Sequence, residues 1–557
     1  MDLSAFANWS QYPFTIEALS IAALLAFTCR FARTERALNR LARHRLAPLA
    51  AGVFALLLRA AALPVAPVPQ PSLHDEFSYL LAADTFAHGR ITNPPHPMWE
   101  HFETFHEDQL PTYQSMYPPL QGLVLGAGQA ILGTPFAGVW FSTGLLCAAL
   151  CWALRGWFPP GWALLGAAIA AIRLAMFSYW GNSYWGGALA ATGGALVFGA
   201  LPRLIRSSRP RDALIAALGL AMLANSRPYE GLVFSVAVSL VALWRVRRLR
   251  LRTILPPLCA ALAVTGALMA YYNWRVFGSP TSLPYTVNRA TYAVAPVFLF
   301  QTLRPEPAYR HAQLREFYTG WEVNSFLTGR SKRGFALLGV NKVLTVWNFY
   351  LGPVLTIPLL ACFLTWRSRR TRILLFLAAS AVLASAVVPF FVPHYVAPAT
   401  VVIYALLLQG MRRLRQSFPR MVRAVPLVCL LMAAVRLGMA AASVPLEPEW
   451  PLTWVRAWPS PFGREKIAAG IRAHGGQHLV IVRYLQYTAA QYVYNDADID
   501  ASPIVWAQDM GPEKNAELLH YFSSRKVWLL EIDGDSRVLT PLREPLTAPG
   551  FLPNGDR

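Results

Sequence analysis

Two adjacent carboxylates, Asp75 and Glu76, open the first long polar stretch of a chain that is otherwise mostly apolar. If the stretch Ser72-Leu-His-Asp-Glu-Phe-Ser-Tyr79 is helical, Asp75 and Tyr79 lie one turn apart on the same face. A carboxylate fixed on such a helix can take a proton from a hydroxyl group. A capping box from Ser72 to Asp75, with acids favoured in the first turn, explains the same pattern by structure alone.

Cationic side chains near the expected outer ends of other helices are candidates to hold an anion: Arg90, Arg173, Arg227, Arg275 and His394. Arg173 lies inside an apolar run, where a charge indicates function, but snorkelling to the membrane surface explains its position at least as well. Arg227 and Glu230 lie three residues apart, so they can bind a ligand or simply pair with each other.

Several uncharged side chains are further binding candidates: Tyr79, Tyr117, Asn182, Tyr184 and Tyr395. Asn182 and Tyr184 belong to an aromatic cluster over 179–185, where an amide and a phenol suit a ligand rich in hydroxyl groups. Aromatic belts at membrane interfaces produce such clusters without any ligand.

Three histidines of the first polar stretch, His96, His101 and His106, lie among several acids. This composition allows a divalent cation, but the irregular spacing of the histidines favours a solvated polar loop. We therefore expect no metal site. The six cysteines fall in or beside apolar runs without paired spacing, so we expect them to be small buried hydrophobes.

The composition is that of a polytopic membrane protein, because 55% of the 557 residues are hydrophobic and only 14% are charged. The net charge of +21 comes mainly from short arginine-rich links between apolar runs, which argues against a nucleic-acid partner. A mostly α-helical bundle over 1–443 is expected, with about 12 spans at 12–29, 46–68, 135–154, 162–180, 186–204, 213–226, 229–244, 253–273, 341–364, 373–393, 396–411 and 425–443.

The arginine-rich links at 30–45, 203–211, 245–252, 367–372 and 412–423 all fall on one side when these spans are threaded in order. The positive-inside rule places that side in the cytoplasm. The loops 69–117 and 274–340 and both termini then face outward, and a short apolar run near 117–133 is expected to be interfacial or re-entrant. The first apolar run lacks signal-peptide features and is expected to remain as an anchor.

From about residue 444 to 557 the chain has the composition of a soluble protein, with more acidic than basic residues. Helical and strand patterns alternate there: helices at 465–474 and 512–522, and strands at 478–484, near 504–506 and at 526–532. This alternation predicts a small C-terminal α/β domain with parallel strands on the outer side of the membrane.

The order of these motifs resembles the GT-C superfamily of integral membrane glycosyltransferases, in the branch of protein O-mannosyltransferases and aminoarabinose transferases. The residues that carry the resemblance are Asp75-Glu-Phe-Ser-Tyr79, Gly89-Arg90, Tyr117-Pro-Pro119, and the segments 178–187, 225–231, 272–278 with 283–285, and 394–398. The similarity covers about 70–430 and rests on the order of the motifs, since no single one is specific.

The resemblance implies transfer of a sugar, usually with inversion, from a polyprenyl-phosphate donor to an unknown glycan, lipid or protein acceptor at the outer face of the cytoplasmic membrane. Asp75 would be the general base, and Glu76 would shape the site. Two features depart from the family: Met116 stands where relatives often have a phosphate-binding Lys, and the usual acid in the second outer turn is missing from 181–185. Without the Lys, arginines elsewhere would have to bind the donor phosphate, and the missing acid weakens a metal-dependent mechanism.

Two other classes of protein compete with this interpretation. A transporter usually shows broken helices and ionisable groups near the membrane midplane in related halves, whereas the acids here cluster outside the apolar runs. A non-catalytic assembly or receptor protein, derived from a transferase, would explain the two departures but not the intact Asp75-Glu76 pair.

Overall fold

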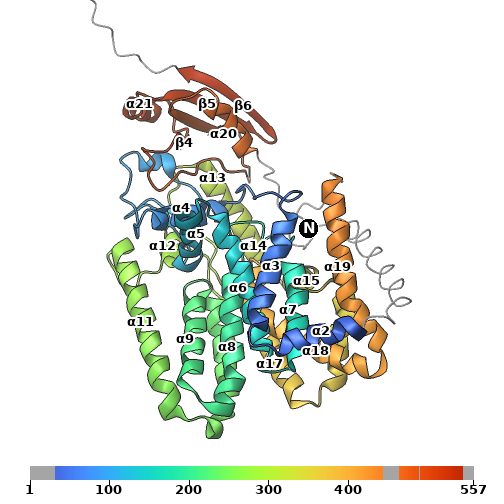
Figure 1. The fold of residues 1–557 in the computed structure, drawn as a ribbon. Coiled ribbons are helices and arrows are strands. Elements are labelled where there is room, and N and C mark those ends of the chain that lie inside the picture. The colour runs from blue at the N-terminus through green and yellow to red at the C-terminus, as the bar shows by residue number, and fades with distance from the viewer. Residues whose placement is uncertain (1–31, 443–462, 489, 544–557) are drawn as a thin grey trace, which may run out of the picture.

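A computed structural model describes residues 32–442, 463–488 and 490–543 (Figure 1). The predicted span at 12–29, both termini and the start of the tail lie outside the described residues. Within them, every predicted span overlaps a helix of a large apolar bundle. The bundle contains α3 (Ala47–Ala62), α6 (Phe136–Leu154), α7 (Pro160–Leu174), α8 (Ala188–Ser207), α9 (Pro210–Ala224), α10 (Pro228–Leu243), α11 (Leu251–Phe277), α15 (Lys332–Tyr350), α16 (Gly352–Ala361), α17 (Arg369–Ala386), α18 (Thr400–Ser417) and α19 (Pro419–Ala441).

Five helices of the described chain are long and apolar enough to cross a membrane, or seven spans if each bent helix pair counts as one. The expected number of about twelve spans is therefore not confirmed by helix length and composition. Apolar helices such as α7 and α9 have 15 residues each, fewer than the roughly 20 that a straight span needs. Val264 and Leu268 of α11 expose 60% and 64% of their surface, as expected for a helix that faces lipid.

The predicted span 341–364 is not one continuous helix, because α15 and α16 meet at an angle of 103°. The break lies at Gly352, which has a positive φ of 66°, followed by Pro353. Proline has no backbone N–H to continue the helix, and glycine tolerates the left-handed conformation. Shorter helical elements precede or connect the others: α2 (Ala32–Arg43), η3 (Val246–Arg248), η5 (Cys362–Thr365) and η6 (Pro393–Ala399).

The first polar loop folds over one end of the bundle. It contains α4 (His74–Ala87), η2 (Trp99–Phe102) and a two-stranded hairpin of β1 (Glu107–Asp108) and β2 (Gln114–Ser115), and it leads into α5 (Pro119–Leu132). The run near 117–133 is thus a short apolar helix, as expected from its length. The long loop contains α12 (Pro284–Tyr292), α13 (Ala312–Arg315), the π-helix η4 (Glu316–Trp321) and α14 (Glu322–Arg330).

The C-terminal segment forms a four-stranded sheet of order β4-β3-β5-β6 on top of the first loop (Figure 1). Its elements are α20 (Arg464–Arg472), β3 (His478–Tyr484), β4 (Ile504–Gln508), α21 (Pro512–Tyr521), β5 (Lys526–Asp533) and β6 (Ser536–Arg543). The β3 strand pairs in parallel with β4 and β5, as the alternating pattern predicts, whereas the antiparallel edge strand β6 was not anticipated.

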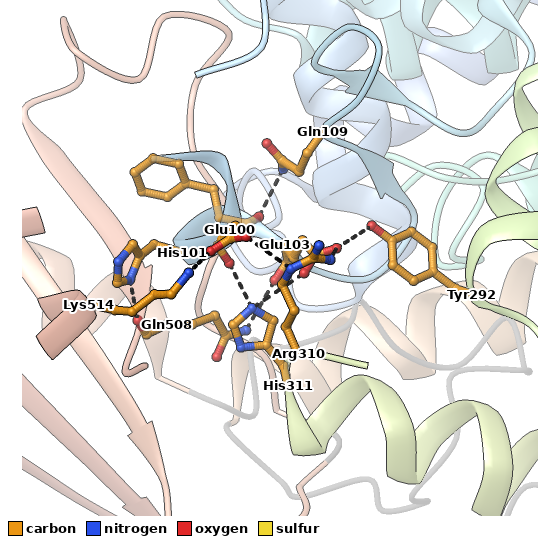
Figure 2. A network of polar contacts seen from close by, with 10 residues as sticks. Glu100, His101, Glu103, Gln109, Tyr292, Arg310, His311, Gln508 and Lys514 are labelled. Carbon is orange, nitrogen blue, oxygen red and sulfur yellow. Dashed lines mark hydrogen bonds and ion pairs between the residues drawn. The ribbon is translucent and has the colours of Figure 1, made fainter. Parts of the chain in front are cut away.

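The sheet shares a hydrophobic core with the first loop. Leu81, Phe102 and Tyr113 of the loop pack with Leu479 and Val505 of the sheet. Polar contacts extend this interface, and Figure 2 shows that Glu100 is their centre: Arg310 Nε lies 3.2 Å from its Oε1, and Lys514 pairs with its Oε2. The first loop is therefore held by the long loop on one side and by the sheet on the other.

Candidate active site

The close packing of α4 on α5 fixes the position of the Asp75-Glu76 pair. Gly122 and Gly126 of α5 face α4 so closely that an added Cβ at Gly126 would lie 2.7 Å from the carbonyl oxygen of Ala83. Alanine or any larger residue at these positions would push the two helices apart. The glycines of α5 thus bring α4 against the bundle and set where its first turn lies.

The carboxylate that caps α4 is Glu76 rather than Asp75. The N-cap residue is Leu73, and Glu76 Oε2 accepts hydrogen bonds from the backbone N–H groups of Ser72 at 2.9 Å and Leu73 at 3.1 Å. The predicted capping box from Ser72 to Asp75 is therefore wrong by one residue. Because Glu76 fulfils the capping role, the Asp75 side chain is not needed to cap the N-terminus of α4.

Glu76 also connects α4 to the turn between α7 and α8. Its Oε1 accepts from the backbone N–H of Tyr184 at 3.0 Å, and the Tyr184 hydroxyl donates to the carbonyl oxygen of Pro69 at 3.0 Å. Glu76 is only 1% exposed. Burial raises its pKa, against the opposing effect of these N–H donors. Both oxygens are occupied by backbone donors, so Glu76 and Tyr184 hold the first turn in place.

Asp75 lies in a polar cluster with His74, His106 and Tyr117, named here the Asp75 site. The Tyr117 hydroxyl donates a hydrogen bond to Asp75 Oδ1 and lies 3.0 Å from His106 Nδ1. Because a phenol has one hydrogen, the second contact requires His106 Nδ1–H as the donor to Tyr117. His74 Nε2 lies 3.4 Å from Asp75 Oδ2, so each carboxylate oxygen has a polar neighbour.

The surroundings of Asp75 favour its ionised form. Burial alone would raise the pKa of Asp75, but the positive charge that His106 and His74 carry at low pH, the Tyr117 hydrogen bond and Arg227 together hold it below its ordinary value. Burial lowers the pKa of His106 to about 3, so this imidazole is neutral near pH 7. An ionised carboxylate beside a neutral imidazole, with 18% of its side chain exposed, can accept a proton from a bound hydroxyl group.

His106 reaches Asp75 through an unusual backbone conformation. Its φ is 63°, which costs a non-glycine residue on the order of 1–2 kcal/mol. Two hydrogen bonds to the His106 carbonyl oxygen fix this conformation: Ser78 Oγ donates at 2.6 Å and the Met116 N–H at 3.0 Å. Since Ser78 belongs to α4, the helix that carries Asp75 also holds the turn that carries His106.

Aromatic side chains from three segments enclose the Asp75 site. The Tyr79 ring stacks on Tyr117 with centroids 4.4 Å apart. Phe317, from the π-helix η4 of the long loop, packs edge-on to His74 at 5.6 Å. Burial raises the pKa of Tyr79 to about 12, so its hydroxyl stays protonated. Tyr79, Tyr117 and Phe317 therefore form apolar walls around the carboxylate.

Arg227 supplies positive charge to the same region. It is the N-cap residue of α10, and its guanidinium carbon lies 4.9 Å from the centroid of the Tyr395 ring. Its charge acts on Asp75 and Tyr79. Among the described residues no hydrogen bond or ion pair engages this guanidinium, and Glu230 does not come within 4.0 Å of it as an ion pair. The alternative that Arg227 simply pairs with Glu230 is thus not what the structure shows.

His394 precedes Tyr395 in η6 and is almost fully buried. Its backbone N–H donates to the Tyr179 hydroxyl at 3.2 Å, and its Nδ1 lies 2.9 Å from the same oxygen. Because the phenol accepts from the backbone, its own hydrogen points to Nδ1. His394 therefore ties η6 to the turn after α7, and its neighbour Tyr395 contacts the Arg227 guanidinium.

Three predicted anion-binding arginines lie away from Asp75. Arg90 follows the last turn of α4, whereas Asp75 lies in its first, about 20 Å along the helix. Arg275 is exposed near the end of α11 and donates to the Tyr271 hydroxyl at 3.1 Å. Arg173 is 0% exposed and donates to the carbonyl oxygen of Asn348 at 2.9 Å. Its guanidinium neither extends to the membrane surface nor reaches the Asp75 site. It donates instead to backbone carbonyl groups at the C-terminal end of α15.

Asn182 is also a structural residue in this fold. Its side-chain amide donates to the carbonyl oxygens of Met176 and Ser178, each at 2.9 Å, and it is fully buried. These hydrogen bonds join two parts of the turn that follows α7. The predicted contact of Asn182 with hydroxyl groups of a ligand would require opening this turn, so Asn182 does not belong to the Asp75 site.

Sequence reasoning missed the part played by His74 and His106. Their ring nitrogens and an oxygen of Asp75 lie within 4.8 Å of one another, an arrangement that can hold a divalent cation. The hydrogen bond from His106 Nδ1–H to Tyr117 makes this nitrogen unavailable to a metal ion. His96 and His101 lie elsewhere and contact Asp500 and Gln508 of the C-terminal segment.

No family model matches the chain. No curated protein matches it either. Among solved structures, ArnT from Cupriavidus metallidurans bound to undecaprenyl phosphate aligns with a TM-score of 0.48 and 13% identity, over 86% of this chain and 91% of that chain. The Archaeoglobus fulgidus oligosaccharyltransferase tethered with an acceptor peptide aligns with a TM-score of 0.40 and 12% identity, over 79% of this chain and 62% of that chain. Similarity at these values assigns no function to the chain.

Proposed function

We propose that the chain is a membrane glycosyltransferase that moves a sugar from a polyprenyl-phosphate donor to a hydroxyl acceptor at the outer face of the cytoplasmic membrane. The observation that carries this proposal is the geometry at Asp75: an ionised, partly exposed carboxylate with Arg227 in electrostatic range, at one end of an apolar bundle. A base and a cation at one site are what transfer from a phosphate leaving group requires.

In the proposed reaction, Asp75 accepts the hydrogen of the acceptor hydroxyl as the acceptor oxygen attacks the anomeric carbon. The bond from that carbon to the phosphate oxygen breaks, and the electron pair leaves with the phosphate. Arg227 provides N–H donors to the phosphate oxygens on which charge develops. A single displacement of this kind inverts the anomeric centre.

The remaining residues of the site keep the base oriented. Tyr117 holds one oxygen of Asp75, His106 holds Tyr117, and Glu76 holds the turn on which Asp75 lies. Tyr79, Tyr395 and Phe317 limit access of water, which strengthens the interaction of the carboxylate and the guanidinium with substrate.

The test is a transfer assay with the full chain in lipid nanodiscs and polyprenyl-phosphate donors carrying different labelled sugars. Envelope lipids, glycans and proteins serve as acceptors, and release of polyprenyl phosphate is measured together with labelled product. The proposal predicts donor-dependent release with at least one sugar. Transport of labelled sugar into proteoliposomes without formation of product would instead support a transporter.

A further inference from the structure

A strongly basic pocket lies at the end of the bundle opposite the Asp75 site. It has a volume of about 380 Å³ and is lined by Arg369, Arg370, Arg412 and Arg413 together with Thr365 and Ser368. The pocket lies between η5, the start of α17 and the end of α18. The far end of α17 leads into η6, which carries His394, so the length of α17 separates this basic pocket from the region of Arg227.

The arginines of the basic pocket have no acidic partner within the described residues. No carboxylate lies within 4.0 Å of any of the four guanidinium groups; the acid near the end of α18, Glu35, pairs with Arg415 and Arg423 instead. Positive charges that lie close together without a counter-ion repel each other, and a bound anion offsets this repulsion.

Two of the arginines are brought together by one aromatic ring. The guanidinium carbons of Arg370 and Arg412 lie 5.0 Å and 5.9 Å from the centroid of Phe158. Both side chains are half-buried. Burial and the neighbouring Arg412 charge lower the pKa of Arg370, which belongs to the link before the apolar part of α17. Arginines that only snorkel would extend their guanidinium groups into water. The guanidinium groups of Arg370 and Arg412 instead converge on the ring of Phe158.

Further groups in the pocket suit an anion. The guanidinium carbon of Arg369, an exposed side chain, lies 4.0 Å from the centroid of the Trp244 ring. The N-cap residue of the 18-residue helix α17 is Ser368, and no side chain caps its first N–H groups. Unoccupied N–H groups at a helix start favour phosphate oxygens. Guanidinium groups gathered around a helix start form a site for a group with several anionic oxygens.

The surface beside the pocket is apolar. Leu360, Phe363, Leu364 and Trp366 each expose more than half of their surface. Exposed side chains of this kind on a membrane helix are covered by acyl chains. We propose that the basic pocket binds a phosphate-bearing anion, either the headgroup of an anionic membrane lipid or a soluble phosphate ester, and that it is separate from the Asp75 site.

The test compares the full chain with the double variant Arg370→Gln/Arg412→Gln. The matched control is Arg247→Gln/Arg248→Gln, which removes the same charge from exposed arginines of η3 outside the pocket. Each protein is placed in phosphatidylcholine alone, in phosphatidylcholine with phosphatidylglycerol, and in phosphatidylcholine with inorganic phosphate. Bound lipid or phosphate is counted by native mass spectrometry, and the melting temperature is recorded.

The proposal predicts that phosphatidylglycerol or inorganic phosphate raises the melting temperature of the wild type. The affinity of the double variant for that probe should fall at least about tenfold, while the control keeps wild-type affinity. A response to phosphatidylglycerol alone identifies a lipid headgroup, and a response to inorganic phosphate identifies a soluble ester. Equal loss in the double variant and the control, or no loss in either, would overturn the proposal.

Should the double variant fail to fold in phosphatidylcholine, the single variant Arg412→Gln repeats the comparison with Arg247→Gln as its control. It keeps Arg370 on the ring of Phe158 and removes the neighbouring charge. The expected loss of affinity is then smaller, but it still has to exceed that of the control for the proposal to stand.

Discussion

Tyr117 donates the hydrogen of its hydroxyl group to Asp75 Oδ1, which joins the segment before α5 to the first turn of α4. The same hydroxyl oxygen lies 3.0 Å from His106 Nδ1. This relationship fixes one carboxylate oxygen, identifies the tautomer of His106, and helps to keep Asp75 ionised. Each of these consequences can be measured separately.

The variant Tyr117→Phe should shift the acid limb of the pH–rate profile to higher pH. Asp75 acts as a base only when ionised, so activity is present above its pKa and is lost as the pH falls through it. Removing the hydrogen bond removes one cause that lowers the pKa of Asp75, and the pKa therefore rises. Asp75 remains ionised at pH 7, but it loses the hydrogen bond that orients Oδ1. The rate at pH 7 should therefore fall by about tenfold, less than the roughly 10²- to 10⁴-fold effect of a lost base.

The matched control for this variant is Tyr113→Phe. Tyr113 lies in the same loop, but its hydroxyl donates to the carbonyl oxygen of Asn495 at 3.1 Å rather than to Asp75. Its acid limb should coincide with that of the wild type. An unshifted limb in Tyr117→Phe would show that the hydrogen bond does not influence the catalytic base.

The variant Arg227→Gln should weaken binding of the polyprenyl-phosphate donor. The guanidinium has no ion pair to any residue that the structure describes, so its charge remains available to the phosphate. We expect the KM for the donor to rise at least about tenfold, since a charge-assisted hydrogen bond contributes roughly 1.5–3 kcal/mol. Steady-state kinetics with varied donor measure this, and unchanged kinetics would remove Arg227 from the proposed mechanism.

Arg275→Gln provides the control for the loss of an arginine. Arg275 is exposed and bonded to Tyr271, away from Asp75. Its KM for the donor should equal that of the wild type. Arg227→Lys should restore part of the affinity, because the ammonium keeps the charge but not the planar pair of donors.

The variant Glu76→Gln should lower the stability of the fold more than the rate of the chemical step. Its Oε2 accepts backbone N–H groups from Ser72 and Leu73, and its Oε1 accepts that of Tyr184. The amide of Gln would turn its own N–H group toward at least one of these backbone N–H groups. That backbone N–H would then lack an acceptor, and an unsatisfied buried group costs about 1–3 kcal/mol. A lower melting temperature with nearly normal kcat in the folded fraction is expected. A stable but inactive variant would instead place Glu76 in the chemical step.

Chelation of divalent cations should leave the transfer rate unchanged. The three candidate ligand atoms of His74, Asp75 and His106 lie within 4.8 Å of one another, but the hydrogen bonds at Tyr117 occupy Asp75 Oδ1 and His106 Nδ1. Rates measured before and after EDTA treatment and dialysis test this. Loss of activity that returns with added Zn²⁺ or Mn²⁺ would show that the cluster binds a metal.

The sequence predicted much of the helical scaffold because long apolar runs carry a strong signal. It also placed Asp75 in the first turn of a helix. It assigned the cap to the wrong acid, since Asp75 and Glu76 are adjacent and a capping pattern does not distinguish registers one residue apart. The break inside 341–364 did have a signal, the Gly352-Pro353 pair, which ends helices.

Contacts across long loops could not be predicted in the same way. His106 approaches Asp75 only because its backbone adopts a left-handed φ of 63°. No periodic pattern of apolar residues predicts such a conformation. Arg173 was expected near the surface, but its partners are carbonyl groups at the end of a helix distant in sequence. The edge strand β6 had a local signal that was overlooked, because Gly534-Asp535 is a typical two-residue hairpin turn.

The most direct measurement of the central claim is the transfer rate of Asp75→Asn. This variant keeps the shape of the side chain but removes the proton acceptor. Asp535→Asn, at a fully exposed position of the C-terminal sheet, controls for the loss of one acidic charge. We predict that Asp75→Asn folds and binds donor but transfers sugar at a rate reduced by about 10²-fold or more, while Asp535→Asn behaves as wild type. Wild-type turnover by folded Asp75→Asn would contradict the account.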